Sequence, residues 1–251
     1  MTGVFRAEAV KLKRSSIWII AVLLPLLAVV TGTINLANNT QTLDSGWASF
    51  TSQVVLFYGL LFYSMGISLL AAAIWRVEHR GTNWNALLTA TARPIRLVLA
   101  KIVAILVPVA LMQAVLVGGT AVSGLFVLRL DGPFPVAFLL VGLIATVAAL
   151  PLIAVQSLLS LLLRSFAAPV ALCLVGCVAG VAAVTSAALR PLAEVLPQAI
   201  NTRALNLGST AIAGSGGLTT ADTLPLLATS VGLGALVVLL TLAAIRVVKL
   251  R

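Results

Sequence analysis

The sequence is poor in the side chains that carry most chemistry. Its 251 residues include six acidic residues, one histidine and two cysteines. No G-x-x-x-x-G-K-[ST] segment occurs, so the chain lacks the loop through which many ATPases bind nucleotide. Cys173 and Cys177 have no histidine or carboxylate near them in the sequence, which favours small buried residues over a metal site. We therefore expect a protein that is not an enzyme, with no catalytic, cofactor or metal site of its own.

Apolar residues are abundant. They make up 61% of the chain, and charged residues only 9%, whereas soluble domains carry about 25% charged residues. The apolar residues form six contiguous runs, each close to the roughly 20 residues that a spanning helix needs, and no run contains an ionisable residue. We predict an all-α integral membrane protein with one transmembrane domain, 1–251. Its six spans are 17–37, 54–74, 102–128, 135–163, 167–189 and 224–245.

The cations lie on alternate sides of these spans. Thirteen of the 16 Lys and Arg residues fall before the first span, in the second and fourth loops, or after the last span. The positive-inside rule then places both termini and the second loop in the cytoplasm. The net charge of +10 is thus explained by topology and by contact with anionic membrane lipids, and it does not predict nucleic-acid binding.

The first 16 residues form a basic segment that we expect to lie as a helix on the cytoplasmic surface. Phe5, Ala9 and Leu12 would face lipid, while basic side chains would reach the headgroups. Glu8 interrupts the apolar stripe. The residues assigned to this interfacial helix are Phe5, Glu8, Lys11, Lys13 and Arg14.

The second loop contains a short amphipathic helix, predicted over 81–92. Thr82 can cap it, and Trp84, Leu88 and Thr91 share one face. Pro94 ends it, because the residue before a proline is disfavoured in helical geometry. The apolar face can pack on lipid headgroups or dock a soluble partner, and the composition leaves both interpretations open.

The last outer loop, 190–223, is long, and 192–207 is apolar enough to enter the outer leaflet as short re-entrant helices covered by protein. Gly176 and Gly180 have GxxxG spacing on the fifth span, which permits close helix packing within the chain or at a dimer face.

Few polar or aromatic side chains lie inside the spans. They pack helices together, or they form the wall of a path for an amphipathic substrate. The candidates for such a path are Asn35, Gln53, Tyr58, Phe62 and Tyr63.

Several motifs together resemble the permease subunit of type-2 ABC exporters, in the lantibiotic-immunity and bacitracin-resistance branch. Glu8-Ala9-Val10-Lys11-Leu12-Lys13-Arg14-Ser15 is similar to that family's start, E-x-x-K-x-K/R-x-S. Trp47 and Phe50 resemble its aromatic pair before span two. Glu78-His79-Arg80-Gly81-Thr82-Asn83-Trp84-Asn85-Ala86-Leu87-Leu88 resembles the signature E-x-x-x-G-T/N-x-W-x-x-L, followed by Arg93-Pro94-Ile95-Arg96 and Lys101.

The resemblance implies that 81–92 is a coupling helix seated on a separate ATPase subunit that binds ATP and Mg²⁺. The residues it assigns to this contact are Glu78, Arg80, Gly81, Thr82, Trp84, Leu87 and Leu88. A second permease subunit, identical or paralogous, would complete the path in a bacterial plasma membrane. Pro94 departs from the family pattern because it shortens the coupling helix.

The expected function is therefore ATP-driven export of an amphipathic or hydrophobic compound, such as a peptide antibiotic, a drug or a lipid-like molecule. Two other classes stay open at this point. An ion-coupled secondary carrier is disfavoured because such carriers usually place ionisable residues within their spans. A non-transporting sensor subunit would keep the same fold.

Overall fold

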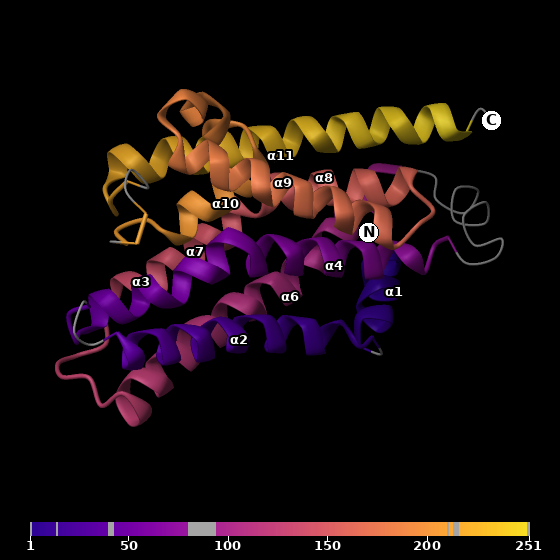
Figure 1. Cartoon of the computed structure of the whole chain (residues 1–251). Helices are drawn as coiled ribbons and strands as arrows, with labels where there is room; N and C mark the ends of the chain where they lie inside the picture. The colour runs from indigo at the N-terminus through magenta and orange to yellow at the C-terminus, as the bar shows by residue number, and fades with distance from the viewer. Residues whose placement is uncertain are drawn as a thin grey trace.

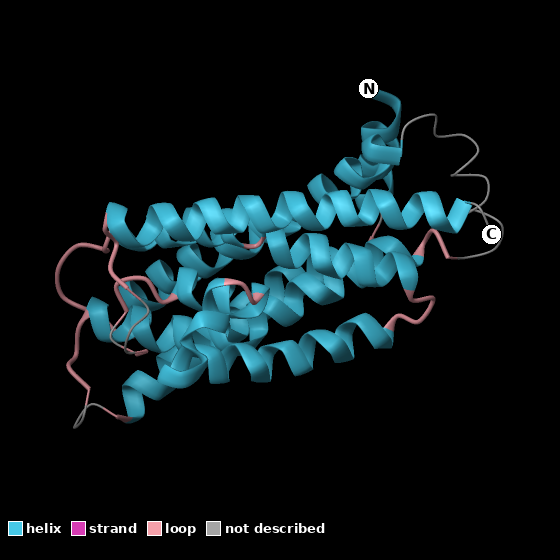
Figure 2. Cartoon of the chain, turned by 90° about the horizontal axis from the view of Figure 1, so that it is seen from above, coloured by secondary structure: helices cyan, strands magenta, loops and turns pink. Residues whose placement is uncertain are grey.

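The computed structural model describes residues 2–13, 15–39, 43–79, 94–209, 211–212 and 216–249, with the backbone alone for residue 2 and for 246–249. All regular structure in these ranges is helical, which confirms the predicted all-α fold class (Figures 1 and 2). The helices, in chain order, are α1 (Thr2–Lys13), α2 (Ile17–Asn38), α3 (Trp47–Phe57), η1 (Tyr58–Phe62), α4 (Tyr63–Arg76), α6 (Pro94–Val122), η2 (Ser123–Val127), α7 (Ala137–Ala148), α8 (Leu150–Leu162), α9 (Ala167–Thr185), η3 (Ala187–Glu194), α10 (Pro197–Leu205) and α11 (Thr220–Lys249).

Six helical segments are long and apolar enough to cross a membrane, as the sequence predicted. Large apolar side chains are exposed on their outer faces; Leu236, Leu239 and Leu240 of α11, for example, are each more than half exposed. Such a surface suits a lipid environment. The six segments are Ile17–Asn38, Trp47–Arg76, Pro94–Val127, Ala137–Leu162, Ala167–Thr185 and Thr220–Ile245.

Several segment boundaries differ from the apolar runs. The second segment begins at Trp47 rather than at residue 54, so Trp47 and Phe50 are buried in the first turn of α3 instead of lying in a loop. The third begins at Pro94, since proline fits the first turn of a helix, where its missing N–H has no intrahelical partner. The fifth ends at Thr185, and the chain continues as the 3₁₀ helix η3.

The two ends of the bundle are distinct. α1, the last turn of α4, the first turn of α6 and the last turns of α11 lie together at one end, here named the α1 end (Figure 1). The α2–α3, η2–α7 and α9–α10 connections lie at the other, here named the α10 end. α1 does not continue α2 but crosses the bundle (Figure 1). The indole Nε1 of Trp18 donates to the Leu12 carbonyl (3.0 Å) and stabilises this bend.

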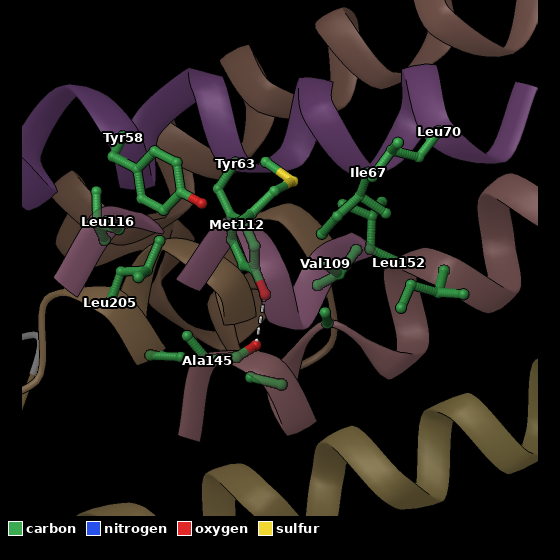
Figure 3. Close-up of a cluster of buried hydrophobic side chains, with 14 of the residues drawn as sticks. Tyr58, Tyr63, Ile67, Leu70, Val109, Met112, Leu116, Ala145, Leu152 and Leu205 are labelled. Carbon is green, nitrogen blue, oxygen red and sulfur yellow. Dashed lines mark hydrogen bonds between the residues drawn. The ribbon is translucent and has the colours of Figure 1, made fainter. Parts of the chain in front are cut away.

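The core is centred on α4, which contacts α2, α6, α8 and α9. Tyr63, Ile67 and Met112 are fully buried, and the Tyr63 hydroxyl donates to the Ala145 carbonyl at 2.8 Å (Figure 3). A buried tyrosine in lipid needs such a partner because no water is available to it. This hydrogen bond joins the centres of the second and fourth segments.

α10 is a short helix inserted between α9 and α7 and almost wholly buried, which agrees with the predicted re-entrant character of the 192–207 stretch. The π-helical segment η1 faces it: the Thr202 hydroxyl donates to the Gly59 carbonyl (2.7 Å). A π-helical turn leaves a carbonyl free for such a contact. A Cβ added at Gly180 would lie 3.1 Å from the Ala199 backbone nitrogen. The GxxxG glycines therefore serve close packing inside the chain.

Candidate functional site: a buried charge cluster

Four charged side chains meet at the α1 end, and they are here called the buried charge cluster: Glu8, Lys11, Glu78 and Lys101. Glu8 and Lys11 come from α1, Glu78 follows the last turn of α4, and Lys101 lies two turns into α6. Glu8 and Glu78 are 5% and 2% exposed, and Lys101 is fully buried. The cluster has no net charge because its two carboxylates face two ammonium groups.

Lys101 is the centre of the cluster. Its Nζ lies 2.5 Å from Glu78 Oε1 and 2.8 Å from Glu8 Oε2, and it donates to the Ile74 carbonyl at 3.3 Å. The ammonium group therefore has two hydrogen bonds, to Glu78 and to the Ile74 carbonyl, and a further ion pair with Glu8. The Trp75 ring centroid lies 5.6 Å from the same nitrogen and adds a cation–π contact. Full pairing is what makes a buried lysine tolerable.

Lys11 closes the cluster on its solvent side. Its Nζ donates to Glu8 Oε1 (2.9 Å) and to Glu78 Oε1 (2.7 Å), and its side chain is 37% exposed. Glu8 thus uses one oxygen for each lysine, while Glu78 shares a single oxygen between both. A cavity of about 270 Å³ beside the cluster is lined by α1, α4 and α6 residues, including Leu12 and Ile74.

The pairing shifts two pKa values in opposite directions. Burial by itself raises the pKa of Glu78, but the charge of Lys101 and the hydrogen bonds from Lys101 and Lys11 outweigh it, so the pKa lies below its ordinary value. Burial lowers the pKa of Lys11, but the hydrogen bonds to Glu78 and Glu8 and their charges raise it above its ordinary value. Both groups therefore stay charged over the whole neutral range.

The cluster corrects two expectations from the sequence. Lys101 was assigned to a loop outside charge-free spans, but it is buried inside α6 because that helix begins at Pro94. Glu8 appeared as an interruption of the lipid-facing stripe of α1, whereas it faces the bundle, and Ala9 beside it is exposed. Glu8's position in an apolar stripe was the one available sign of its burial.

The other residues assigned to the interfacial helix behave differently from Glu8. Phe5 is half-buried and Lys13 is exposed, as an interfacial position would have them. Of the residues assigned to ATPase coupling, the structure describes only Glu78. The others, and Arg14 of the interfacial helix, lie outside the described residues: Arg80, Gly81, Thr82, Trp84, Leu87 and Leu88.

The residues proposed for a translocation path do not form one surface. Tyr58 and Tyr63 are fully buried in the core, with ring centroids 5.3 Å apart (Figure 3). Asn35 donates from Nδ2 to Gln53 Oε1 (2.6 Å) and joins α2 to α3, with both residues half-buried. Phe62 is also half-buried. Within this single chain the two tyrosines pack helices together.

A larger cavity at the α10 end was not expected from the sequence. Its volume is about 340 Å³, and it lies between the first turns of α3 and α7 and the segment after α10. Its lining is mainly apolar, with Trp47 and Phe138 among the side chains and hydroxyls from Thr51, Ser52 and Ser209. Within the described part of the chain, no group of three or more His, Cys, Asp or Glu residues is placed to hold a metal ion.

Comparison with known proteins agrees with this architecture. The family model of the ABC-2 family transporter proteins matches residues 4–180, well over half of the 251-residue chain. The match includes all four residues of the buried charge cluster and ends within α9, before α10. No curated protein matches the chain. The chain is therefore a multi-pass membrane protein that belongs to the ABC-2 transporter family, whose members are the membrane subunits of ABC transporters and work with an ABC ATPase.

Proposed function

We propose that this chain is the permease subunit of an ATP-driven exporter in a bacterial plasma membrane, with both termini cytoplasmic. A separate ATPase subunit binds ATP and Mg²⁺, and a second permease, identical or paralogous, completes the path. The single transmembrane domain 1–251 supplies no catalytic group in this scheme. Its task is to convert movement of the ATPase into movement of its helices.

The buried charge cluster carries this proposal. Glu78 and Lys101 stand on either side of the 81–92 segment, which the motif resemblance assigns to the ATPase contact, and their ion pair joins the end of α4 to α6. Glu8 joins α1 to the same pair. A displacement of the segment would therefore move α1, α4 and α6 together, because separating any of them would expose a buried charge.

The cavity at the α10 end supports an amphipathic or hydrophobic cargo. Its mainly apolar walls with a few hydroxyls would accept an apolar body with a small polar group, and none of the described residues that line it is charged. A peptide antibiotic, a drug or a lipid-like molecule fits that description. Export of such a compound would serve antibiotic resistance or immunity.

The deciding experiment is affinity purification of the tagged chain from native membranes in mild detergent. We expect a stoichiometric partner that contains a Walker A loop. The double variant Trp84→Asp/Leu88→Asp should lose this partner and the resistance together. Asn38→Asp/Ser45→Asp, which introduces the same charge at the other end of the bundle, should keep both. A chain that always purifies alone would contradict the proposal.

Reconstitution distinguishes the alternatives. An ion-coupled carrier would transport in vesicles that contain this chain alone under a proton or sodium gradient. A sensor subunit would bind the ATPase without moving any compound. The exporter proposal requires transport that depends on ATP and on the ATPase subunit.

A further inference from the structure

The α1 end carries more positive charge than the chain can pair. All six acidic side chains of the sequence lie in the described ranges. The α2–α3, η2–α7 and α9–α10 connections and the first turn of α11, all at the α10 end (Figure 1), contain Asp44, Asp131, Glu194 and Asp222. The other two, Glu8 and Glu78, are already bound to Lys11 and Lys101. No acidic side chain of this chain is left at the α1 end for the remaining cations there.

Two of these cations line one hollow. Arg76, in the last turn of α4, and Arg164, in the α8–α9 turn, are both exposed. Neither has a hydrogen bond or ion pair within the described part of the chain, although Arg76 lies over the Phe166 ring at 5.6 Å from its centroid. The polar and aromatic residues of the hollow are Arg76, His79, Ser160, Arg164, Ser165 and Phe166.

Two hydrogen bonds define the shape of the hollow. His79 Nε2 donates to the Ser160 carbonyl (2.7 Å) and holds the end of α4 against the end of α8. The Ser165 hydroxyl accepts from the Ala168 backbone N–H (3.3 Å) and shapes the first turn of α9. The start of this 19-residue helix adds positive potential to that of the two guanidinium groups.

The surroundings of the hollow belong to lipid. Leu162, two residues before Arg164, is 50% exposed. Cations beside exposed apolar side chains at the end of a spanning helix are placed at headgroup depth. A second copy of this chain could not neutralise them, because it has the same shortage of acidic side chains at this end.

We infer that Arg76 and Arg164, on the rim of this shallow hollow of about 10 Å³, bind the phosphate of an anionic glycerophospholipid at the protein surface. The lipid tails lie along the apolar surface that begins at Leu162. Guanidinium groups suit this role because they pair with phosphate oxygens in a fixed fork. The inference rests on the membrane-spanning fold and on the charges, and it is independent of the exporter proposal.

The test measures lipid retained by the purified full chain in detergent, using native mass spectrometry with added dioleoyl-phosphatidylglycerol or dioleoyl-phosphatidylcholine. The wild type should retain one tightly bound phosphatidylglycerol. Arg76→Gln/Arg164→Gln should weaken this binding about 30-fold, since each cation near a headgroup contributes roughly a factor of five. Arg6→Gln/Arg96→Gln, with the same loss of charge at the same end, should keep the bound lipid.

Three results would overturn the inference. Equal loss in both double variants would mean diffuse attraction without a site. If inorganic phosphate stabilised the wild type against heat as strongly as phosphatidylglycerol does, the hollow would be assigned to a soluble anion. If Arg76→Gln/Arg164→Gln lost the ATPase but bound lipid as the wild type does, the two arginines would be assigned to contact with the protein partner. If the glutamine variant does not fold, Arg76→Lys/Arg164→Lys decides: it should bind with intermediate affinity, and wild-type affinity would contradict the arginine-specific geometry.

Discussion

The α1 end and the α10 end both bury polar side chains, but they do so with different chemistry. At the α1 end, buried ions from α1, α4 and α6 pair with one another around Lys101. At the α10 end the buried polar groups are neutral, and neutral groups tolerate an unpaired atom at either end: Asn201 Oδ1 and Asn206 Oδ1 at the α10 end, and Trp75 Nε1 beside the cluster. An unpaired buried charge costs far more than an unpaired amide oxygen, so only the α1 end needs complete pairing.

This difference matters for movement. A fully paired cluster of ions has one favourable arrangement, so the three helices that it joins move as a unit. A helix held by neutral hydrogen bonds and by close packing can shift at smaller cost, because net energies of such bonds between membrane helices are about 1 kcal/mol. We therefore expect α10 to be the more adaptable element of the two.

Removing the central lysine should have the largest effect. Lys101→Met leaves Glu8 and Glu78 buried with only the half-exposed Lys11 as partner, and breaking a buried pair in this way costs about 3–5 kcal/mol. Thermal unfolding in detergent would measure the loss. Lys13→Met, on the exposed face of α1, is the matched control and should change stability little. Similar values for the two variants would show that the buried lysine contributes no more to stability than an exposed one.

Neutralising Glu78 should cost less, and its effect should depend on pH. Glu78→Gln keeps an acceptor oxygen but loses the charge, so we expect a loss of about 2 kcal/mol at neutral pH. The pKa of Glu78 is lowered on folding, so its stabilisation is fully present above the ordinary value of 4.5 and is lost as pH falls through the lower folded pKa.

The pH dependence of stability tests the charge of Glu78 separately from the shape of its side chain, because glutamine keeps the shape and removes the charge. Unfolding measured from neutral to acid pH should show a flatter acid limb in Glu78→Gln than in the wild type. Parallel acid limbs in the wild type and Glu78→Gln would show that the charge of Glu78 does not stabilise the fold.

A neutral hydrogen bond at the α10 end should be worth about 1 kcal/mol. Thr202→Val removes the donor to the Gly59 carbonyl, the contact between α10 and the π-helical segment η1, at nearly constant volume. Thr185→Val, whose hydroxyl bonds within α9 on an exposed position, is the control. The comparison would fail if Thr202→Val cost as much as Lys101→Met.

The exposed ion pair at the α10 end should contribute least. Arg203 Nη1 lies 2.6 Å from Glu194 Oε2, but the Glu194 side chain is 52% exposed. Exposed pairs contribute roughly 0–1 kcal/mol, so Glu194→Gln should change the unfolding midpoint only slightly. High salt should weaken this pair and leave the buried charge cluster almost unaffected. A salt response of equal size in both would contradict the assigned burial.

The spans were predictable because a membrane imposes length and apolarity on each helix separately. The segment boundaries were less predictable: the apolar run begins at residue 54, whereas α3 begins at Trp47, and the Thr51 hydroxyl donates to the Trp47 carbonyl inside this helix. The spacing of Gly176 and Gly180 predicted close packing of α9, but only the structure shows that α10 is the element packed against them. A local pattern describes one face of a helix and not the neighbour that covers it.

By itself, the sequence determined a six-span helical membrane protein and the motifs that relate it to ABC permeases, because hydropathy and motif spacing are local properties. Only the tertiary structure decided that Glu8, Glu78 and Lys101, from three separate helices, form one neutral buried cluster, and that α10 returns into the bundle. The physical reason is that ion pairing and burial depend on distances between segments far apart in the chain, and these distances exist only once the helices have packed.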